Sequence, residues 1–466
     1  MKDTQDILRK LVSSSPVFTE ARFHKRRTHS VSVQKGLVKQ TKASLTVGVG
    51  FRVLVDGAWG FSSTSDFSEY SLAKTLKSAI ECATSLSQLK KSKLSSLPST
   101  SLARGEFILD GYKELEGMSL KDKLGIVLQA EEATRKHSGT IQTASCGYNE
   151  IFEDKHIITS DGADALSLLA RSEIKFSAVA SHNGEMAEGY ASSGKTGAWS
   201  CLFQEKSIES MTNQTAELAV DLLRAPKMPG GVSTLILSPA IVGLLSHEAI
   251  GHTVEADFVL SGSVAKDKIG QKVASPLVTL CDGGIVPHYA NGGGDLLVDD
   301  EGVPTQTTLI IKDGLLNSYL HNRESAAIFG VAPTGNARAW LYSDEPLIRM
   351  RNTYVAPGND TLENMISTTE DGYLVEGALG GQADSTGEFM FGAQKVTRIE
   401  KGKKKNLFRG ATLSGQAFDV LSTVDAVSKE FHLDLGSGYC GKGQPAKVDA
   451  GGPYIRCKAK IGGVQE

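Results

Sequence analysis

Two histidines and a glutamate lie within six residues of one another, in the segment Ser246-His247-Glu248-Ala249-Ile250-Gly251-His252. Two neutral imidazoles can hold a divalent zinc ion, and a catalytic site adds a third protein ligand and keeps one position open for water. A carboxylate beside the ligands can take a proton from that water, whose pKa the metal lowers to about 7. The segment therefore predicts the core of a metal site, with His247 and His252 as ligands and Glu248 as the base.

The spacing of the two histidines is unusual for a helix. They are five residues apart, whereas the helical zinc-peptidase motif spaces its histidines four apart. Five steps of an ideal helix separate two side chains by about 140°, and four steps by about 40°. We therefore expect either a π-bulge in the helix or a helix that ends near Gly251. We favour a break or bulge at Gly251, because glycine tolerates unusual backbone conformations.

The residues before this segment predict a rigid support. Residues 232–237 read as a buried strand, and Ser238 and Pro239 suit the N-cap and the first position of a helix. Apolar residues of this helix would pack into the core, and they are Ile241, Val242, Leu244 and Leu245. The helix would then present His247 and Glu248 at its far end.

Several groups could provide the third ligand. The candidates are Glu255, Asp257, His288, His321, Cys440 and the acidic trio Asp299, Asp300 and Glu301. Each also has an ordinary explanation. Glu255 could orient an imidazole through a hydrogen bond, the trio could form a turn, and His288 and His321 could lie at the surface. Spacing alone leaves this choice open.

Four segments in the C-terminal half resemble the TldD/PmbA family of metallopeptidases, and they occur in the order seen in that family. They are His-Glu-Ala-Ile-Gly-His-Thr-Val-Glu-Ala-Asp (247–257), Val-Asp-Asp-Glu-Gly-Val-Pro-Thr (298–305), Ala-Pro-Thr-Gly-Asn-Ala-Arg (332–338) and Gly-Ser-Gly-Tyr-Cys-Gly-Lys-Gly-Gln (436–444). The N-terminal half resembles the family in layout more than in motifs. The PmbA (TldE) branch resembles TldD in fold but lacks the metal ligands. This chain has residues of those types, so it resembles the TldD branch.

The resemblance implies one zinc ion per chain, bound by His247, His252 and Cys440. A thiolate between glycines can approach an ion closely, and the ion keeps it deprotonated. The implied activity is hydrolysis of peptide bonds in flexible chains, with Glu248 activating the water. The main alternative is a catalytically silent subunit that binds peptides or supports an active paralogue. A metal-dependent hydrolase of another substrate is a third possibility.

The resemblance also implies a homodimer, or a heterodimer with a PmbA-like paralogue. Residues 380–389 are glycine-rich and could add an extended peptide substrate as an extra strand. A glycine-rich turn between strands explains the same segment equally well.

The charge balance indicates neither nucleic acid nor a membrane as a partner. The 466 residues include 50 basic and 53 acidic ones, for a net charge of −3. The sequence shows no secretory signal and no apolar run long enough to span a bilayer. Six scattered cysteines favour reduced thiols in the cytoplasm over a disulfide framework.

The predicted fold class is α+β, with an N-terminal α+β domain (1–225) and a C-terminal, mainly antiparallel β domain (226–466) that carries the metal-site helix. The boundary falls at 226–231, where two prolines and two glycines interrupt helix and strand. Helices are expected at about 3–15, 119–136, 205–224 and 416–430. Strands are expected within 28–63 and 140–181, with hairpin turns at Asp56-Gly57 and Asp313-Gly314.

A basic cluster lies in the first domain and consists of Arg22, His24, Lys25, Arg26 and Arg27. We interpret it as a solvated strand edge, where charge discourages pairing with other chains.

Overall fold

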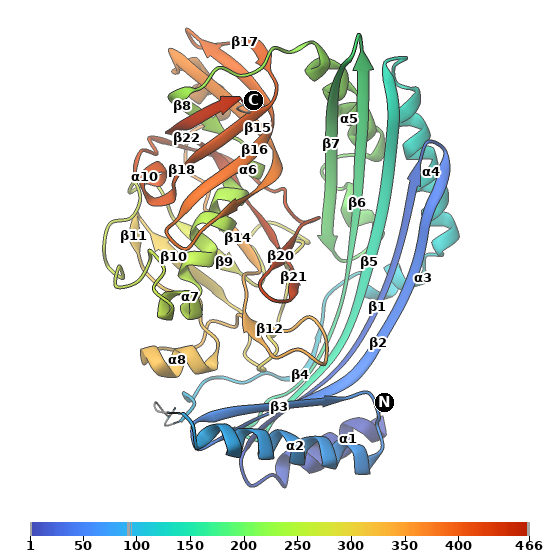
Figure 1. The fold of residues 1–466 in the computed structure, drawn as a ribbon, viewed down its shortest axis with the longest axis vertical. Helices are drawn as coiled ribbons and strands as arrows, with labels where there is room; N and C mark the ends of the chain where they lie inside the picture. The colour runs from blue at the N-terminus through green and yellow to red at the C-terminus, as the bar shows by residue number, and fades with distance from the viewer. Residues whose placement is uncertain (1, 91–93, 95, 464–466) are drawn as a thin grey trace.

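Two large sheets organise the protein (Figure 1), whose computed structural model describes residues 2–90, 94 and 96–463. The strands of the first sheet all lie within residues 18–196, and those of the second lie within residues 231–463. The fold is therefore α+β, and the C-terminal part is mainly β, as predicted. The division into two domains near Pro226 stays a prediction, which this separation of the sheets supports.

The first sheet has seven strands in the order β3-β2-β1-β5-β6-β4, with β7 also paired to β6. They are β1 Phe18–Gln34, β2 Leu37–Val55, β3 Ala58–Thr64, β4 Arg104–Ile108, β5 Ile141–Thr159, β6 Asp164–His182 and β7 Glu185–Thr196. All pairs are antiparallel except β4 with β6. The turn at Asp56-Gly57 joins β2 to β3, and both residues have positive φ, as the predicted hairpin requires.

Helices cover the first sheet in two groups. The helices α1 (Lys2–Ser13) and α2 (Glu69–Ser87) pack on one end, where Leu8 and Leu72 belong to the same buried cluster as Phe51. The helices α4 (Leu120–Lys136) and α5 (Ile208–Arg224) pack farther along the sheet, and α3 (Tyr112–Gly117) precedes α4. Three predicted helices, those at about 3–15, 119–136 and 205–224, are confirmed. Figure 1 shows the long strands curving around the C-terminal part.

The second sheet has eleven strands, and its long final strand β22 (Asp449–Gly463) pairs with four others, namely β8, β14, β18 and β19. The other strands are β8 Gly231–Leu237, β9 Leu280–Gly283, β10 Thr307–Lys312, β11 Leu315–Leu316, β14 Asn352–Val355, β15 Asp371–Ala383, β16 Glu388–Glu400, β17 Lys403–Phe408, β18 Ala411–Gln416 and β19 Ala426–Leu433. Only β14 with β22 and β15 with β8 are parallel. The predicted turn at Asp313-Gly314 joins β10 to β11.

Two two-stranded sheets and several short helices complete the C-terminal part. The small sheets pair β12 (Ala337–Arg338) with β13 (Leu347–Ile348), and β20 (Tyr439–Gly441) with β21 (Pro445–Lys447). The short helices include α8 (Arg323–Phe329) and α9 (Leu362–Ser367). The helix predicted at about 416–430 is wrong. The segment forms only a short helix, α10 (Ala417–Ser422). Strand β19 begins at Ala426, because the following residues pair with β22.

The interpretation of the basic cluster as a solvated strand edge is also wrong. Strand β1 lies between β2 and β5, and Arg22, His24 and Arg26 are buried. Arg22 donates to the carbonyl of Leu341 at 3.2 Å, and Arg26 donates to that of Trp340 at 2.8 Å. These cations therefore fasten the first sheet to a loop of the C-terminal part.

None of the helices in the described ranges combines the length and the apolar character that crossing a membrane requires. All six cysteines are free, and Cys82 is the exposed one among them.

Candidate metal centre

A π-helix carries His247 and leads directly to His252. Helix α6 (Pro239–Leu244) continues into the π-helix Leu245–Gly251, and a 3₁₀ turn (His252–Val254) follows. The N–H of His252 donates to the carbonyl of His247, so the hydrogen bond spans five residues. Residues five apart therefore lie one above the other, and the predicted π-bulge is confirmed.

The reason given for a glycine at position 251 is wrong. Gly251 has φ −53° and ψ −50°, which any residue adopts in a helix. A Cβ atom at this position would lie 2.0 Å from Sδ of Met350, which is fully buried. Close packing, and not an unusual backbone, requires the glycine.

The support of the site agrees with prediction in most respects. Strand β8 leads directly into α6, Ser238 occupies the N-cap position and Pro239 the first turn. The Ser238 side chain makes no capping hydrogen bond. Helix α6 packs closely on β22, since a Cβ atom at Gly243 would lie 2.6 Å from the backbone of Ala450.

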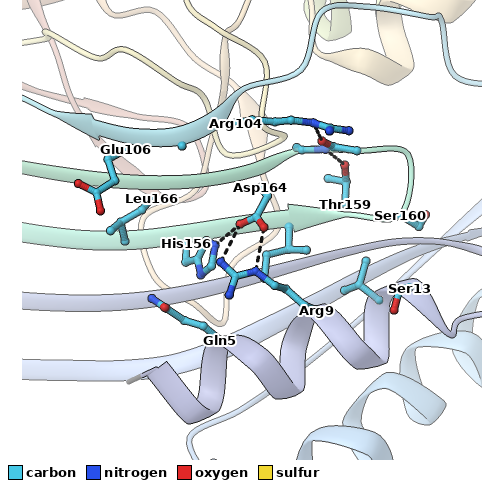
Figure 2. A pocket seen from close by; sticks show the side chains of 15 residues that line it. Gln5, Arg9, Ser13, Arg104, Glu106, His156, Thr159, Ser160, Asp164 and Leu166 are labelled. Carbon is cyan, nitrogen blue, oxygen red and sulfur yellow. Dashed lines mark hydrogen bonds and ion pairs between the residues drawn. The ribbon is translucent and has the colours of Figure 1, made fainter.

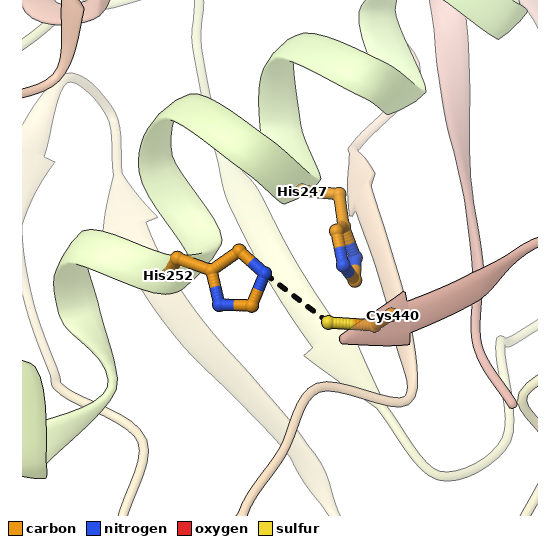
Figure 3. Close-up of side chains that lie close together, drawn as sticks. All are labelled: His247, His252 and Cys440. Carbon is orange, nitrogen blue, oxygen red and sulfur yellow. Dashed lines mark hydrogen bonds between the residues drawn. The ribbon is translucent and has the colours of Figure 1, made fainter. Parts of the chain in front are cut away.

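The two imidazoles differ in their hydrogen bonds (Figure 3). Nδ1 of His252 is hydrogen-bonded to Glu255 Oε2 at 2.8 Å, and its Nε2 lies 3.1 Å from Sγ of Cys440. His247 is 3% exposed, and neither ring nitrogen has a hydrogen-bond partner among the described residues. The ring centroids of the two histidines are 5.2 Å apart and nearly perpendicular.

Cys440 reaches the histidines from a separate hairpin, 188 residues after His252. It lies on β20, which pairs only with β21 among the described strands, and Figure 1 shows this hairpin between the two large sheets. The buried guanidinium of Arg349 donates to the carbonyls of Cys440 at 2.7 Å and Gln444 at 2.6 Å. We did not predict this role of Arg349, because only the fold brings it under the hairpin.

The donor atoms of His247, His252 and Cys440 all lie within 4.8 Å of one another, so the three could hold a metal ion. Burial would raise the pKa of the Cys440 thiol, but the imidazoles of His247 and His252 lower it to about 4. Burial would lower the pKa of His252, but Cys440 and Glu255 raise it to about 10. The thiolate, which is the form that binds metals, is therefore favoured.

Glu248 lies on the same π-helix but outside this group of three. Its side chain is 29% exposed, and its Oε2 lies 3.8 Å from Nε2 of His252. The carboxylate is therefore close to the three donors and still in contact with solvent.

The other candidate ligands lie elsewhere or have other partners. Glu255 holds the ring of His252, Asp257 pairs with Lys442, and His288 is exposed. His321 was expected at the surface but is buried, and burial lowers its pKa to about 4.

The acidic trio forms the expected turn, in which Asp299 accepts hydrogen bonds from the backbone of Glu301 and Val303. The trio is also buried against the first sheet. Asp300 accepts from Lys155 at 2.9 Å, and Glu301 accepts from Arg52 at 2.6 Å. Asp300 and Glu301 therefore join the first sheet to the C-terminal part, Asp299 holds the turn, and none of the three belongs to the metal centre.

A cleft of about 620 Å³ lies away from this centre, between α1 and the ends of β4, β5 and β6 (Figure 2). At its wall, Asp164 accepts a hydrogen bond from Arg9 at 2.8 Å and contacts His156 at 2.6 Å. All its lining residues belong to the first 166 positions of the chain. The cleft therefore contributes no group to the histidine and cysteine cluster.

Two imidazoles, a thiolate and a nearby carboxylate fit a metal ion. The orphaned nitrogens of buried His247 need a partner, and two imidazoles and one thiolate make a donor set used at catalytic zinc. The site therefore has the groups that a metalloprotein with a catalytic type of centre requires.

Comparison with known proteins identifies the family. Residues 19–87, 113–223 and 230–463 match domain 1, the central domain and the C-terminal domain of the PmbA/TldA metallopeptidases. A metalloprotease of Methanocaldococcus jannaschii is 31% identical over 95% of this chain and 96% of its own length. A zinc metalloprotease TldD homolog of Saccharolobus solfataricus is 32% identical over 68% of this chain and 70% of its own.

The chain belongs to the TldD/PmbA family and is a metallopeptidase. The same fold occurs in the crystal structure of TldE from Thermococcus kodakarensis, which has a TM-score of 0.80 at 18% identity and covers 99% of this chain and 100% of that one.

Proposed function

We propose that this chain is a zinc-dependent peptidase in which His247, His252 and Cys440 hold one zinc ion per chain. The observation that carries the proposal is the buried imidazole of His247, which has no hydrogen-bond partner among the described residues. A buried polar group without a partner costs about 1–3 kcal/mol, and a metal bound to the ring would give one of the two nitrogens a partner. The name of the Saccharolobus solfataricus relative supports zinc as the metal.

The chain's own residues would divide the chemistry. When bound, zinc supplies a Lewis acid that polarises the scissile carbonyl and acidifies water. Glu248 takes the proton from the attacking water, and its partial exposure and its position beside His252 support this role. Glu255 fixes the ring of His252 through Nδ1, so that Nε2 points toward Cys440.

The substrate is a flexible or unfolded peptide that binds in extended form. Strand β15 pairs with β8 only over Tyr373–Val375, so residues 376–383 have no strand along that edge in the described part of the chain. A Cβ atom at Gly387, at the turn of this hairpin, would lie 3.9 Å from the carbonyl of Ala249 in the π-helix. An added peptide strand would thus run close to the metal centre. Within the predicted segment 380–389, residues 384–387 form the turn between β15 and β16.

The functional assembly is a dimer, either of this chain or with a PmbA-like paralogue. The likeness in fold to TldE supports a partner of this shape. Six free thiols support a reducing compartment such as the cytoplasm.

The alternative is a catalytically silent subunit that binds peptides for an active paralogue. The three donor groups and Glu248 favour the enzyme, because a scaffold needs none of them.

Zinc content and hydrolysis of an unstructured peptide test the proposal on the purified chain, alone and with a TldE-like partner. We expect about one zinc per chain, and cleavage that a chelator abolishes and added zinc restores. A chain that binds zinc but cleaves nothing with its partner present would establish the scaffold. A chain that cleaves at full rate without metal would refute the zinc mechanism.

A further inference from the structure

The position of the Cys440 hairpin depends on side-chain contacts. Strands β20 and β21 pair with each other and join neither large sheet. Among the described strands, no backbone ladder therefore sets the distance between Cys440 and the π-helix. The side chain of Arg349 holds the hairpin by donating to the backbone carbonyls of Cys440 and Gln444. A second cation, Lys442, lies in the loop between β20 and β21.

Lys442 reaches from this loop to the elements that follow the π-helix. Its Nζ donates to Asp257 at 2.8 Å, to the carbonyl of Ile348 at 3.0 Å and to Glu255 Oε2 at 3.2 Å. The side chain is 12% exposed, so these contacts are largely shielded from water. The ammonium also lies 4.6 Å above the ring of Phe258, which packs against His252.

Glu255 connects Lys442 to a metal-site histidine. Its side chain is fully buried, and the same oxygen, Oε2, meets both Lys442 and Nδ1 of His252. A buried carboxylate needs a compensating charge to stay in place. Lys442 provides that charge, and it does so from the hairpin that carries Cys440 two residues earlier.

We propose that Lys442 is a positioning residue that sets two metal-site ligands at once. It anchors the hairpin of Cys440 directly, and it holds the ring of His252 through Glu255. The inference rests on the proposed function, because it concerns how the chain arranges its zinc ligands. Removing a residue that orients a metal ligand but does not bind the metal typically lowers metal affinity by about 10- to 100-fold.

The experiment compares Lys442→Met with the parent chain. Methionine keeps most of the stem but lacks the ammonium. The zinc dissociation constant is measured by competition with a chelator, and the near-ultraviolet absorption of the cobalt-loaded chain reports the thiolate on the ion. We expect about 10- to 100-fold weaker zinc binding and a weaker thiolate band. Lys442→Arg keeps the charge and should restore part of both.

Two controls separate positioning from a general loss of structure. Lys266→Met removes an exposed lysine near the same elements and should leave both readouts at the parent level. In a Glu255→Gln background, Lys442→Met should weaken zinc binding less than it does alone, because the part of its effect that acts through Glu255 is already lost. If Lys442→Met fails to fold, Lys442→Gln replaces it in every comparison.

The outcomes distinguish this inference from the proposed function. Parent-level zinc affinity and an unchanged cobalt spectrum in Lys442→Met would overturn the positioning role and leave the zinc proposal standing. Equal losses from Lys442→Met with and without Glu255→Gln would overturn the route through Glu255. A parent chain that binds neither zinc nor cobalt would overturn the proposed function and this inference with it.

Discussion

Sδ of Met350 fills the space beside Gly251, 2.0 Å from the position of a Cβ atom there. Met350 directly follows Arg349, which holds the Cys440 hairpin, and Gly251 directly precedes His252. One packing contact thus joins the segment that supports the thiol to the turn that supports an imidazole.

Gly251→Ala is expected to destabilise the protein by about 1–3 kcal/mol, because the added methyl group overpacks a filled core. Denaturant unfolding measures the loss. The cost should shrink in a Met350→Ala background if the contact with Met350 causes it. Gly125→Ala serves as the control, since this helical glycine in α4 has no atom within 4 Å of its Cβ position, and it should be neutral or stabilising by up to about 1 kcal/mol. Equal effects of the two substitutions would contradict the packing argument.

Cys440→Ala is expected to weaken zinc binding, since it removes one of the three donors. Cys281→Ala and Cys457→Ala should keep the zinc, because those thiols are buried elsewhere. Metal analysis after dialysis against a weak chelator provides the measurement. Full zinc occupancy in Cys440→Ala would exclude Cys440 as a ligand and reopen the choice of the third ligand, with Glu255 as the first candidate to test.

Glu248→Gln is expected to keep the metal and the melting temperature while lowering peptide hydrolysis about 10²- to 10⁴-fold, the usual effect of losing a general base. Its partial exposure makes a large effect on stability unexpected. Zinc content, melting temperature and turnover of one variant decide the matter. Turnover at the parent rate in a zinc-loaded variant would exclude Glu248 as the base.

An extended-strand mode of binding predicts that unfolded chains are cleaved much faster than folded ones, because a folded protein cannot offer a free strand to the edge of β15. The test uses one protein in two forms, a stable native domain and the same domain with a destabilising core substitution. Equal cleavage rates for both forms would contradict the binding mode.

Buried His24 predicts a loss of stability in acid. Burial and the charge of Lys155 lower its pKa from 6.5 to about 4, although Glu153 opposes the shift. The unfolded chain therefore takes up this proton first as the pH falls. The contribution is complete above about pH 6.5 and is lost as the pH falls to about 4, and it amounts to roughly 3 kcal/mol.

Unfolding free energies of the parent and His24→Gln between pH 4 and 7 measure this effect. The difference between the two proteins should change with pH by roughly this amount. His182→Gln replaces an exposed histidine and should run parallel to the parent. A pH dependence in His24→Gln identical to that of the parent would show that His24 takes no part.

The sequence by itself determined the local features of this protein. The spacing of five between His247 and His252 required an irregular helix, since a regular one turns the rings apart. Turn residues determined the hairpins at Asp56-Gly57 and Asp313-Gly314, because positive φ is a local property. The four ordered motifs of the C-terminal half indicated the family, since each is a short local sequence.

Only the tertiary structure decided what depends on contacts between distant residues. The apolar spacing of residues 416–430 suits a helix, but pairing with β22 makes 426–433 a strand, since ladder hydrogen bonds override local preference. The charged residues of β1 look solvated in sequence, yet the C-terminal part covers them. Arg349 and Lys442 likewise gained their partners from chain folding, because a cation has no sequence signal for a carbonyl or carboxylate about 90 or more residues away.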